Sequence, residues 1–160
     1  MPRLETLSEV NRRVLQSFPC WEPNTLPWSP LWKPLSQAKA ALVTSAGLHL
    51  RDDQPFIGDP KGGDTSYRVI PSAAKAADIV QSHVSIGFDH TAFYRDMNVT
   101  LPSDRLRELV ERGTLGSIGP HHYSFMGAIR NPRPLLEDTG PEVADRLKAE
   151  GVDLVFITPT

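Results

Sequence analysis

Histidines are the residues of this chain best suited to acid–base chemistry, because imidazole titrates near neutrality. Most of the five histidines follow predicted strands or lie in predicted loops. His90 comes directly after a predicted strand, and His121 and His122 lie in a later segment rich in aromatic residues. We take these three as candidate proton donors. Each of them is equally suited to a structural role in which the ring hydrogen-bonds a loop backbone.

A zinc site is the first alternative use of these histidines, since tetrahedral zinc takes three or four His, Cys or carboxylate ligands. Asp89, His90, His121 and His122 carry such groups. However, the chain has no HxH, HExxH or paired-cysteine spacing. Adjacent histidines would also point to opposite sides of a strand. We therefore predict no metal site, and a metal-dependent hydrolase remains the weakest of the functional alternatives.

Arg68 is the candidate for holding a substrate carboxylate, because its guanidinium presents paired donors. Asp64 lies four residues earlier, at the turn into the same predicted strand. A structural ion pair between Asp64 and Arg68 is the alternative interpretation.

The chain carries no evident nucleophile. Its one cysteine, Cys20, lies in a proline-rich segment far in sequence from every predicted strand end. A single cysteine excludes an internal disulfide and a CxxC redox pair. The GxSxG motif of a serine nucleophile elbow is also absent. Dithiol chemistry would therefore need sulfur or selenium from elsewhere.

The elements that must position these residues alternate between strands and helices. Short apolar runs rich in branched side chains predict strands, and amphipathic stretches bounded by Pro and Gly predict helices. The expected strands are 40–45, 66–70, 83–88 and 152–159, and the expected helices are 4–18, 73–80, 103–112 and 140–151. Residues 120–127 are expected to form a loop. This order predicts an α/β fold with a mostly parallel sheet flanked by helices.

Segment 152–159 is the strongest predicted strand. Its unbroken apolar run is typical of a strand that is buried on both faces of a parallel sheet. In open α/β sheets, ligands bind beyond the carboxyl ends of the strands. Thr158 and Thr160 are therefore candidate substrate-binding residues, together with Ser45 and His49 after the first strand. We expect the sheet to be incomplete at the C-terminus.

Residues 1–39 are expected to form a separate N-terminal part, a helix followed by a strap, and residues 40–160 the α/β domain. Prolines recur at every third or fourth position from 19 to 34, which excludes a regular helix or ladder there. The same stretch holds all three tryptophans, at positions 21, 28 and 32. We expect the rings to press onto the domain, because Trp buries a large area. A partner-binding arm is the alternative.

Charge and hydropathy limit the partners. The 17 basic and 19 acidic residues give a net charge of −2 without a long run of one sign, so we expect neither nucleic acid nor membrane as a partner. The chain has no apolar stretch long enough for a membrane span, and its start does not resemble a signal peptide. We expect a cytoplasmic protein.

An ordered series of motifs resembles the selenoprotein B family of glycine, sarcosine, betaine and D-proline reductases, and is most like the short D-proline-type B subunits. The likeness runs from about residue 28 to residue 160. Its motifs are VTSAGLH at 43–49, GDTSYRVIP at 63–71, DMN at 96–98, RLREL at 105–109, GTLGSIG at 113–119, HYSFMG at 122–127 and LKAEGVD at 147–153.

This resemblance implies an oxidoreductase subunit of amino-acid metabolism that cleaves a carbon–nitrogen bond of a small amine or amino acid at the expense of a dithiol. In the family, the strand that matches 152–159 is followed at once by selenocysteine or cysteine. The resemblance thus implies that a selenocysteine codon after Thr160 has been read as a stop, and that the chain as it stands is inactive. The rival from another class is a non-catalytic small-ligand-binding or assembly module that is complete at 160 residues.

The resemblance also implies the cofactors and partners. No cofactor is expected in this chain, selenocysteine is expected in the full-length product, and a pyruvoyl group is implied on a partner subunit. The expected partners are the small amine or amino-acid substrate, other reductase subunits and a thiol reductant. From their positions in the loops, we assign seven residues to substrate binding: Ser45, His49, Asp64, Arg68, Asn98, Thr158 and Thr160.

Overall fold

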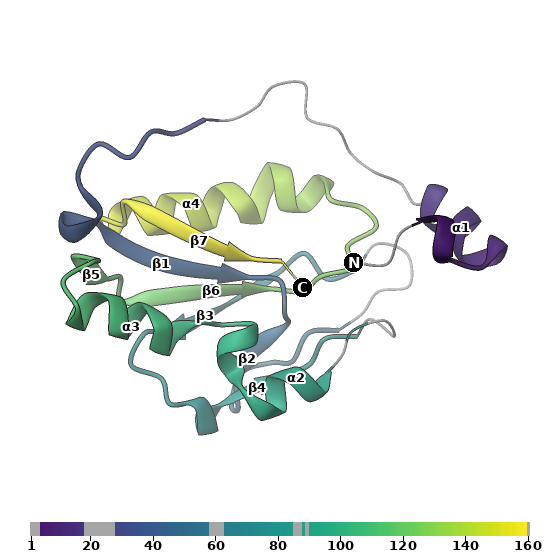
Figure 1. The fold of residues 1–160 in the computed structure, drawn as a ribbon, viewed down its shortest axis with the longest axis horizontal. Coiled ribbons are helices and arrows are strands. Elements are labelled where there is room, and N and C mark those ends of the chain that lie inside the picture. Colours follow the sequence, from purple (N-terminus) through teal and green to yellow (C-terminus); the bar gives the residue numbers. More distant parts are fainter. Residues whose placement is uncertain (1–3, 18–27, 58–62, 85–87, 89, 160) are drawn as a thin grey trace. The chain divides into compact units, whose positions relative to one another are not determined.

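The computed structural model describes residues 4–17, 28–57, 63–84, 88 and 90–159 (Figure 1). The chain divides into two units, residues 1–30 and residues 31–160. The first unit contains a single helical turn, Leu4–Thr6, and the helix α1, Glu9–Gln16. The second unit contains the sheet and every element discussed below. No described helix combines the length and the apolar character needed to cross a membrane.

Strand β1 (Lys39–Thr44) is the centre of the main sheet. On one side it pairs in parallel with β7 (Leu154–Thr158), from Ala40 opposite Leu154 to Thr44 opposite Thr158. On its other side, its start pairs with β5 (Ser117–Ile118) and its end with β6 (His121–Phe125), both in parallel. The antiparallel strand β3 (Tyr67–Pro71) completes this sheet next to β6.

A second, two-stranded sheet joins β2 (Leu48–Leu50) to β4 (Ile79–Gln81) in antiparallel pairing. It is attached to the main sheet at its first residue, because the backbone N–H of Leu48 donates to the Ser124 hydroxyl at 2.8 Å. Helix α2 (His90–Arg95) and the turn Met97–Val99 follow it in the chain. The small sheet therefore brings β4 and its flanking residues to the end of β1.

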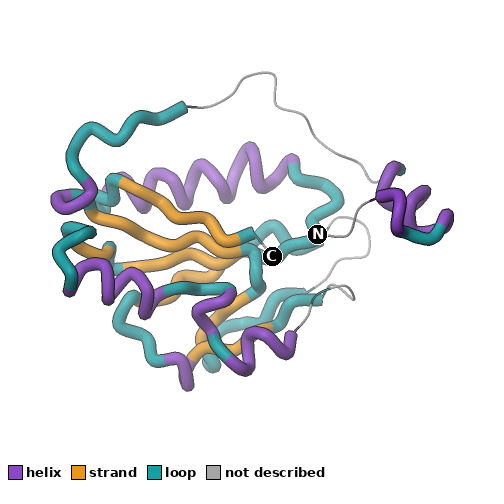
Figure 2. Tube along the Cα trace, in the orientation of Figure 1, coloured by secondary structure: helices purple, strands orange, loops and turns teal. Residues whose placement is uncertain are grey.

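Helices cover both faces of the main sheet (Figure 2). Leu106 of α3 (Ser103–Glu111) packs against Ala40 and Leu42 of β1 in one apolar cluster. Val143 and Leu147 of α4 (Gly140–Ala149) pack against the opposite face, in a cluster that contains Ala41, Tyr123 and Phe125. The predicted α/β fold with a mostly parallel sheet flanked by helices is confirmed.

Strand β6 corrects the expectation of a loop at 120–127. Its side chains alternate: Tyr123 and Phe125 belong to the cluster under α4, whereas His122 and Ser124 are buried within the sheet with other partners. Those two polar side chains are satisfied by backbone N–H groups, His122 by Leu42 and Ser124 by Leu48. Buried polar groups with such partners are tolerated in a core, so a sequence that reads as polar forms a central strand.

The region 73–88 also differs from the prediction. The expected helix 73–80 is a short 3-10 turn, Ala76–Asp78, that leads directly into β4. Alanine favours helices, but intrinsic propensity is a weak predictor of structure, and the pairing of Ile79 with Leu50 across the small sheet outweighs it. The expected strand 83–88 is not a strand at the residues described there, and 85–87 lie outside the described residues.

Two expectations of burial are wrong. Strand β7 pairs with β1 as its only partner among the described residues, and Phe156 and Ile157 remain 53% and 64% exposed rather than buried. The ring of Trp32, in the second unit, is 88% exposed, so it is not pressed onto the domain surface, and that of Trp28, in the first unit, is 85% exposed. Trp21 lies outside the described residues.

Candidate functional site

The carboxyl ends of β1 and β7 are tied together by hydrogen bonds. The backbone N–H of Ser45 donates to the Thr158 carbonyl at 3.2 Å, and the Thr44 hydroxyl donates to the same oxygen at 3.4 Å. The Thr158 hydroxyl donates to the Thr100 carbonyl at 2.7 Å. The structure therefore brings together Ser45 and Thr158, two of the predicted substrate-binding residues. Thr160 lies outside the described residues.

Both covering helices begin at this same end of the sheet. Figure 1 shows that α3 and α4 run opposite to β1 and β7, so their N-termini lie near the strand ends. Thr100, which accepts the hydrogen bond from Thr158, precedes the first residue of α3 by three positions. Helix N-termini carry partial positive charge and favour anionic groups nearby. Asp104 and Glu142, in the first turns of α3 and α4, are acidic groups of the chain itself at these N-termini.

His90, a predicted proton donor, is connected to this edge through one side chain. Its Nδ1 lies 2.9 Å from Oε1 of Gln81, the last residue of β4. Nε2 of Gln81 donates to the Ala46 carbonyl at 3.0 Å, and Ala46 directly follows Ser45 in the chain. His90 is half-buried at the start of α2. The structure thus places His90 two hydrogen bonds away from the residue that follows Ser45.

The Phe88 ring links His90 to His83. The Phe88 ring meets the His90 ring edge-on at a centroid distance of 5.1 Å and stacks on His83 at 4.3 Å. His83 is buried, and burial lowers its pKa, with the neighbouring His90 adding to the effect. Near neutral pH His83 therefore favours its uncharged form, and of the two histidines His90 is the less buried.

Gly47 allows His83 to approach the strand end. Its φ of +65° lies in the left-handed region, and a Cβ there would lie 3.1 Å from the backbone N and Cα of His83. Glycine is the residue that takes such a conformation without a steric cost. Gly47, Gln81, His83 and Phe88 were not predicted as site residues. The sequence contains no signal for the pairing of β2 with β4 that brings Gln81, His83 and Phe88 to Gly47.

His121 lies at the opposite edge of the sheet. It is the first residue of β6, which runs parallel to β1, so it lies at the amino end of its strand. Its Nδ1 donates to Oε1 of Glu150 at 2.7 Å, and the Tyr123 hydroxyl donates to the same oxygen at 3.0 Å. Burial and the neighbouring Glu150 raise the pKa of Tyr123 to about 12. His121 joins β6 to the end of α4 and is not brought to His90.

His122 is almost fully buried. It is 1% exposed, and its Nδ1 accepts a hydrogen bond from the backbone N–H of Leu42 at 3.2 Å. Burial, followed by the positive charge of Arg107, lowers the pKa of His122 to about 4. The ring is therefore neutral at physiological pH and acts as an internal acceptor for β1, and its burial leaves it inaccessible as a proton donor to a substrate.

Arg68 holds the loop that follows Asp53. Its Nε donates to the Gln54 carbonyl at 2.7 Å and its Nη2 to the Pro55 carbonyl at 3.3 Å. The guanidinium also lies 4.4 Å above the Phe56 ring. Most of its donors are thus engaged within the protein, so binding of a substrate carboxylate by Arg68 would require these contacts to break.

Asp64 caps the neighbouring turn. Its carboxylate accepts from the N–H groups of Ile57 at 3.0 Å and of Ser66 at 2.9 Å, and from the Ser66 hydroxyl. Burial acts to raise the pKa of Asp64, but these hydrogen bonds and the charge of Arg68 together hold it below its usual value. Asp64 and Arg68 act on the same loop, and the structure does not bring either of them to His90.

His49 was predicted in a ligand-facing loop and lies instead in β2. It is 5% exposed, pairs with Val80 of β4, and its Nδ1 donates to the Leu50 carbonyl at 2.7 Å. Its ring contacts Phe56 edge-on. These contacts fix the small sheet.

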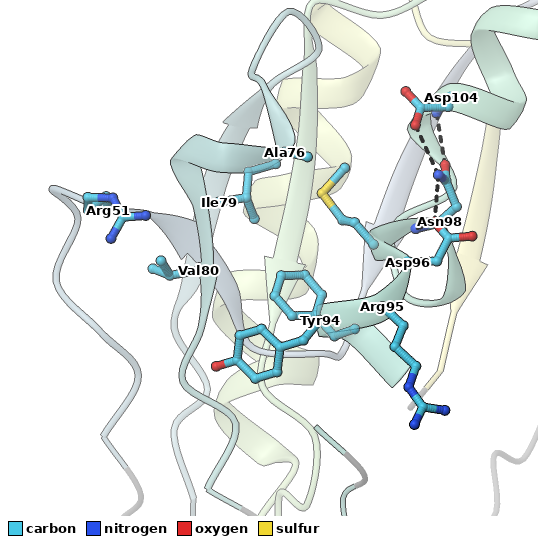
Figure 3. A pocket seen from close by; sticks show the side chains of 11 residues that line it. Arg51, Ala76, Ile79, Val80, Tyr94, Arg95, Asp96, Asn98 and Asp104 are labelled. Carbon is cyan, nitrogen blue, oxygen red and sulfur yellow. Dashed lines mark hydrogen bonds between the residues drawn. The ribbon is translucent and has the colours of Figure 1, made fainter. Parts of the chain in front are cut away.

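Asn98 lies in a polar network beside a cavity of about 650 Å³ (Figure 3). Its side-chain amide donates to Asp96 and Asp104, both at 2.9 Å, and accepts from the backbone N–H of Asp104 at 3.1 Å. The network ties the turn Met97–Val99 to the start of α3. Figure 3 shows Asn98 and Asp104 directed toward each other, on a different side of the cavity from Arg51.

A second cavity, of about 610 Å³, lies under α4 at the ends of the strands. Its lining includes Val43 and Ile157 from the strands and Val143 and Leu147 from the helix, and none of the described residues that line it is charged. Within the described part of the chain, no group of three His, Cys, Asp or Glu side chains is arranged to hold a metal ion.

Comparison with known proteins finds one family. Residues 17–160 match a family model described as glycine/sarcosine/betaine reductase selenoprotein B. The chain is 39% identical over 131 residues to D-proline reductase subunit gamma of Acetoanaerobium sticklandii, which covers 82% of this chain and 52% of that protein. It is 28% identical over 138 residues to glycine reductase complex component B subunit gamma of Carboxydothermus hydrogenoformans, and this match covers 84% of this chain and 31% of that protein.

The betaine reductase complex component B subunit beta of Peptoclostridium acidaminophilum is 28% identical over 128 residues, or 80% of this chain and 29% of that protein. The chain thus spans about half the length of the first of these relatives and about a third of the other two. No solved structure shows significant similarity.

Proposed function

The chain belongs to the glycine/sarcosine/betaine reductase selenoprotein B family, and from this we propose that it serves in the reductive cleavage of a carbon–nitrogen bond in a small amine or amino acid. Its relatives are subunits of D-proline, glycine, betaine and sarcosine reductases. The observation that carries the proposal is the meeting of the ends of β1 and β7 with His90, through Gln81 and Ala46.

The nucleophile in this proposal is a selenocysteine or cysteine that follows Thr160. A selenolate or low-pKa thiolate is ionised at neutral pH and combines strong nucleophilicity with good leaving-group ability. Its position would continue β7 beyond Thr158, whose hydroxyl is anchored on Thr100 before α3. The N-termini of α3 and α4 would then favour the anionic form of the group.

His90 is the proposed proton donor to the departing amine. Overall, one carbon–nitrogen bond breaks, the carbon takes a proton and two electrons, and a dithiol supplies those electrons by closing to a disulfide or a selenide-sulfide. Ser45 and Thr158 present backbone and hydroxyl groups beside the reacting centre. The pyruvoyl group implied for the family would lie on a partner subunit, and other reductase subunits and a thiol reductant complete the proposed assembly.

The reading frame after Thr160 provides the direct test. We expect a UGA codon followed by an in-frame continuation that encodes cysteine, and a native product heavier than 17.7 kDa. The longer product, assembled with its partner subunits, should reduce one member of a panel of D-proline, glycine, sarcosine and betaine with dithiothreitol. A frame that closes at UAA or UAG without further coding sequence would refute the proposal.

A non-catalytic ligand-binding module is the second candidate, and the cavity of about 610 Å³ under α4 favours it, because the described residues that line it are uncharged. Such a module would bind a small, largely apolar ligand at the strand ends without catalysing a reaction. Calorimetric binding to the 17.7 kDa chain, combined with an ordinary stop codon after Thr160, would support the module over the reductase.

A further inference from the structure

We infer that Gln81 is a positioning residue that holds His90 in the tautomer protonated at Nδ1, so that Nε2 is the atom that transfers the proton. The catalytic role of His90 rests on the proposed function. The tautomer itself rests only on the hydrogen bonds of the described residues.

The direction of each hydrogen bond follows from the backbone. The Ala46 carbonyl is an acceptor only, so the group of Gln81 that lies 3.0 Å from it must be the amide nitrogen. The amide oxygen of Gln81 therefore faces His90, at 2.9 Å from Nδ1. An amide oxygen also only accepts. Nδ1 of His90 must carry the hydrogen, and in the neutral ring Nε2 carries the lone pair.

The carbonyl that sets this direction is itself fixed. Ala46 is fully buried, and its N–H donates to the Thr44 hydroxyl at 3.2 Å. On the other side, the backbone N–H of Ser82 donates to the Gly47 carbonyl at 3.0 Å, which holds the residue after Gln81 against the same turn. Gln81 thus has little freedom to exchange its oxygen and nitrogen.

This arrangement suits a proton donor. In the imidazolium form, Nδ1 keeps its hydrogen bond to Gln81 while Nε2, on the other side of the ring, offers the second proton. Loss of the Nε2 proton to a departing amine leaves the Nδ1-protonated neutral ring, which is the tautomer that Gln81 stabilises. No ring rotation is needed before the next proton is taken up.

Two other histidines provide references within the same molecule. Nδ1 of His49 faces the Leu50 carbonyl at 2.7 Å, so His49 must also be protonated at Nδ1. Nδ1 of His122 accepts from the Leu42 N–H at 3.2 Å, so His122 must be protonated at Nε2. The structure therefore predicts opposite tautomers for His49 and His122, with His90 matching His49.

The test is nitrogen NMR of the 160-residue chain labelled with ¹⁵N-histidine, at about pH 9, where unperturbed imidazoles are neutral. A bare ring nitrogen resonates far downfield of a protonated one. Gln81→Glu keeps an acceptor for Nδ1–H and loses the donor to Ala46, whereas Gln81→Leu loses both. We expect the His90 signals of wild type and Q81E to show protonation at Nδ1, and those of Q81L to move toward a mixture of tautomers.

Unchanged His49 and His122 signals in Q81E and Q81L would show that the fold is retained. A purely structural role of Gln81, as a brace on Ala46, predicts that Q81E and Q81L behave alike, because both lose that hydrogen bond. Protonation of wild-type His90 at Nε2, a mixture of tautomers in wild type, or identical His90 signals in Q81L and wild type would each overturn the inference.

Turnover of the longer, assembled product separates this inference from the proposed function. His90→Gln should lower the rate by about 10²- to 10⁴-fold, Q81L by a smaller factor, and Q81E least. Full activity of H90Q, with the tautomers as predicted, would refute the catalytic role of His90 and leave the role of Gln81 in place.

Discussion

Replacement of Gly47 by alanine isolates the contact on which the site is built. Gly47 has a φ of +65°, and an added Cβ would lie 3.1 Å from both N and Cα of His83. Gly113 has nearly the same φ, +68°, but nothing lies within 4 Å of its Cβ position. Gly113→Ala is therefore a matched control that carries the cost of the left-handed conformation without the contact.

The two costs can be separated by magnitude. A non-glycine residue in the left-handed region loses roughly 1–2 kcal/mol, and both variants pay this. A contact at 3.1 Å with backbone atoms forces a shift of β2 away from His83, and overpacking of this kind costs about 1–3 kcal/mol more. We expect G113A to lower the free energy of unfolding by about 1–2 kcal/mol and G47A by about 2–5 kcal/mol.

Urea denaturation followed by far-UV circular dichroism measures both values, with thermal unfolding as a second readout. In G47A the displaced His83 should also change the ring-current shifts of the Phe88 and His90 protons, because these three rings pack together. If G47A is no less stable than G113A, His83 does not lie against the turn as described, and the placement of His90 at the end of β1 is wrong.

Three further perturbations test the surrounding structure. Ser124→Ala removes the acceptor of the buried Leu48 N–H, and we expect a loss of about 1–3 kcal/mol in the free energy of unfolding, measured in urea; a loss below a few tenths would mean that the small sheet is not anchored there. The folded-state pKa of His122 is lowered to about 4, whereas its unfolded value is 6.5. Between these two pH values the unfolded chain therefore binds more protons than the folded chain. The free energy of unfolding should fall as the pH drops from about 6.5 to 4, by up to about 3 kcal/mol. His122→Asn should flatten this dependence in denaturation curves at several pH values, and an unchanged slope would assign it to another group. Arg68→Lys should lower stability by about 1–2 kcal/mol, because a single ammonium nitrogen cannot reproduce the two separate donors, Nε and Nη2, that reach the Gln54 and Pro55 carbonyls. A stable R68K variant with weakened substrate binding in calorimetry would instead restore Arg68 as a carboxylate clamp.

The sequence predicts the elements whose pattern is local. The apolar run at 40–45 corresponds to β1, and the amphipathic stretch at 103–112 corresponds to α3. Both could be predicted because the hydrophobic pattern of neighbouring residues determines which strand, or which face of a helix, is buried. Strand β6 could not be found in this way. Its buried His122 and Ser124 are acceptable only because Leu42 and Leu48, far away in sequence, supply the matching N–H groups.

Only part of the candidate site could be predicted from the sequence. Ser45 and Thr158 follow from the rule that parallel strands deliver their carboxyl ends to one edge, and the structure joins them by a hydrogen bond. The choice among the histidines was not predictable. The end of the sheet at which a histidine lies depends on its place relative to the strand. His121 begins β6 and so lies at the amino end of that strand. His90 comes after β4 in the chain and is connected to the residue after Ser45 through Gln81.

The site is thus assembled from two sheets that are joined at few points. The main sheet supplies Ser45 and Thr158, and the small sheet supplies Gln81, which holds His90. The N–H of Leu48 on Ser124 and that of Gly47 on the Phe125 carbonyl, at 2.9 Å, connect β2 to β6. The distance from the proposed nucleophile to the proposed proton donor is therefore set at this junction, and catalysis should be more sensitive to Gly47 and Ser124 than their own chemistry suggests.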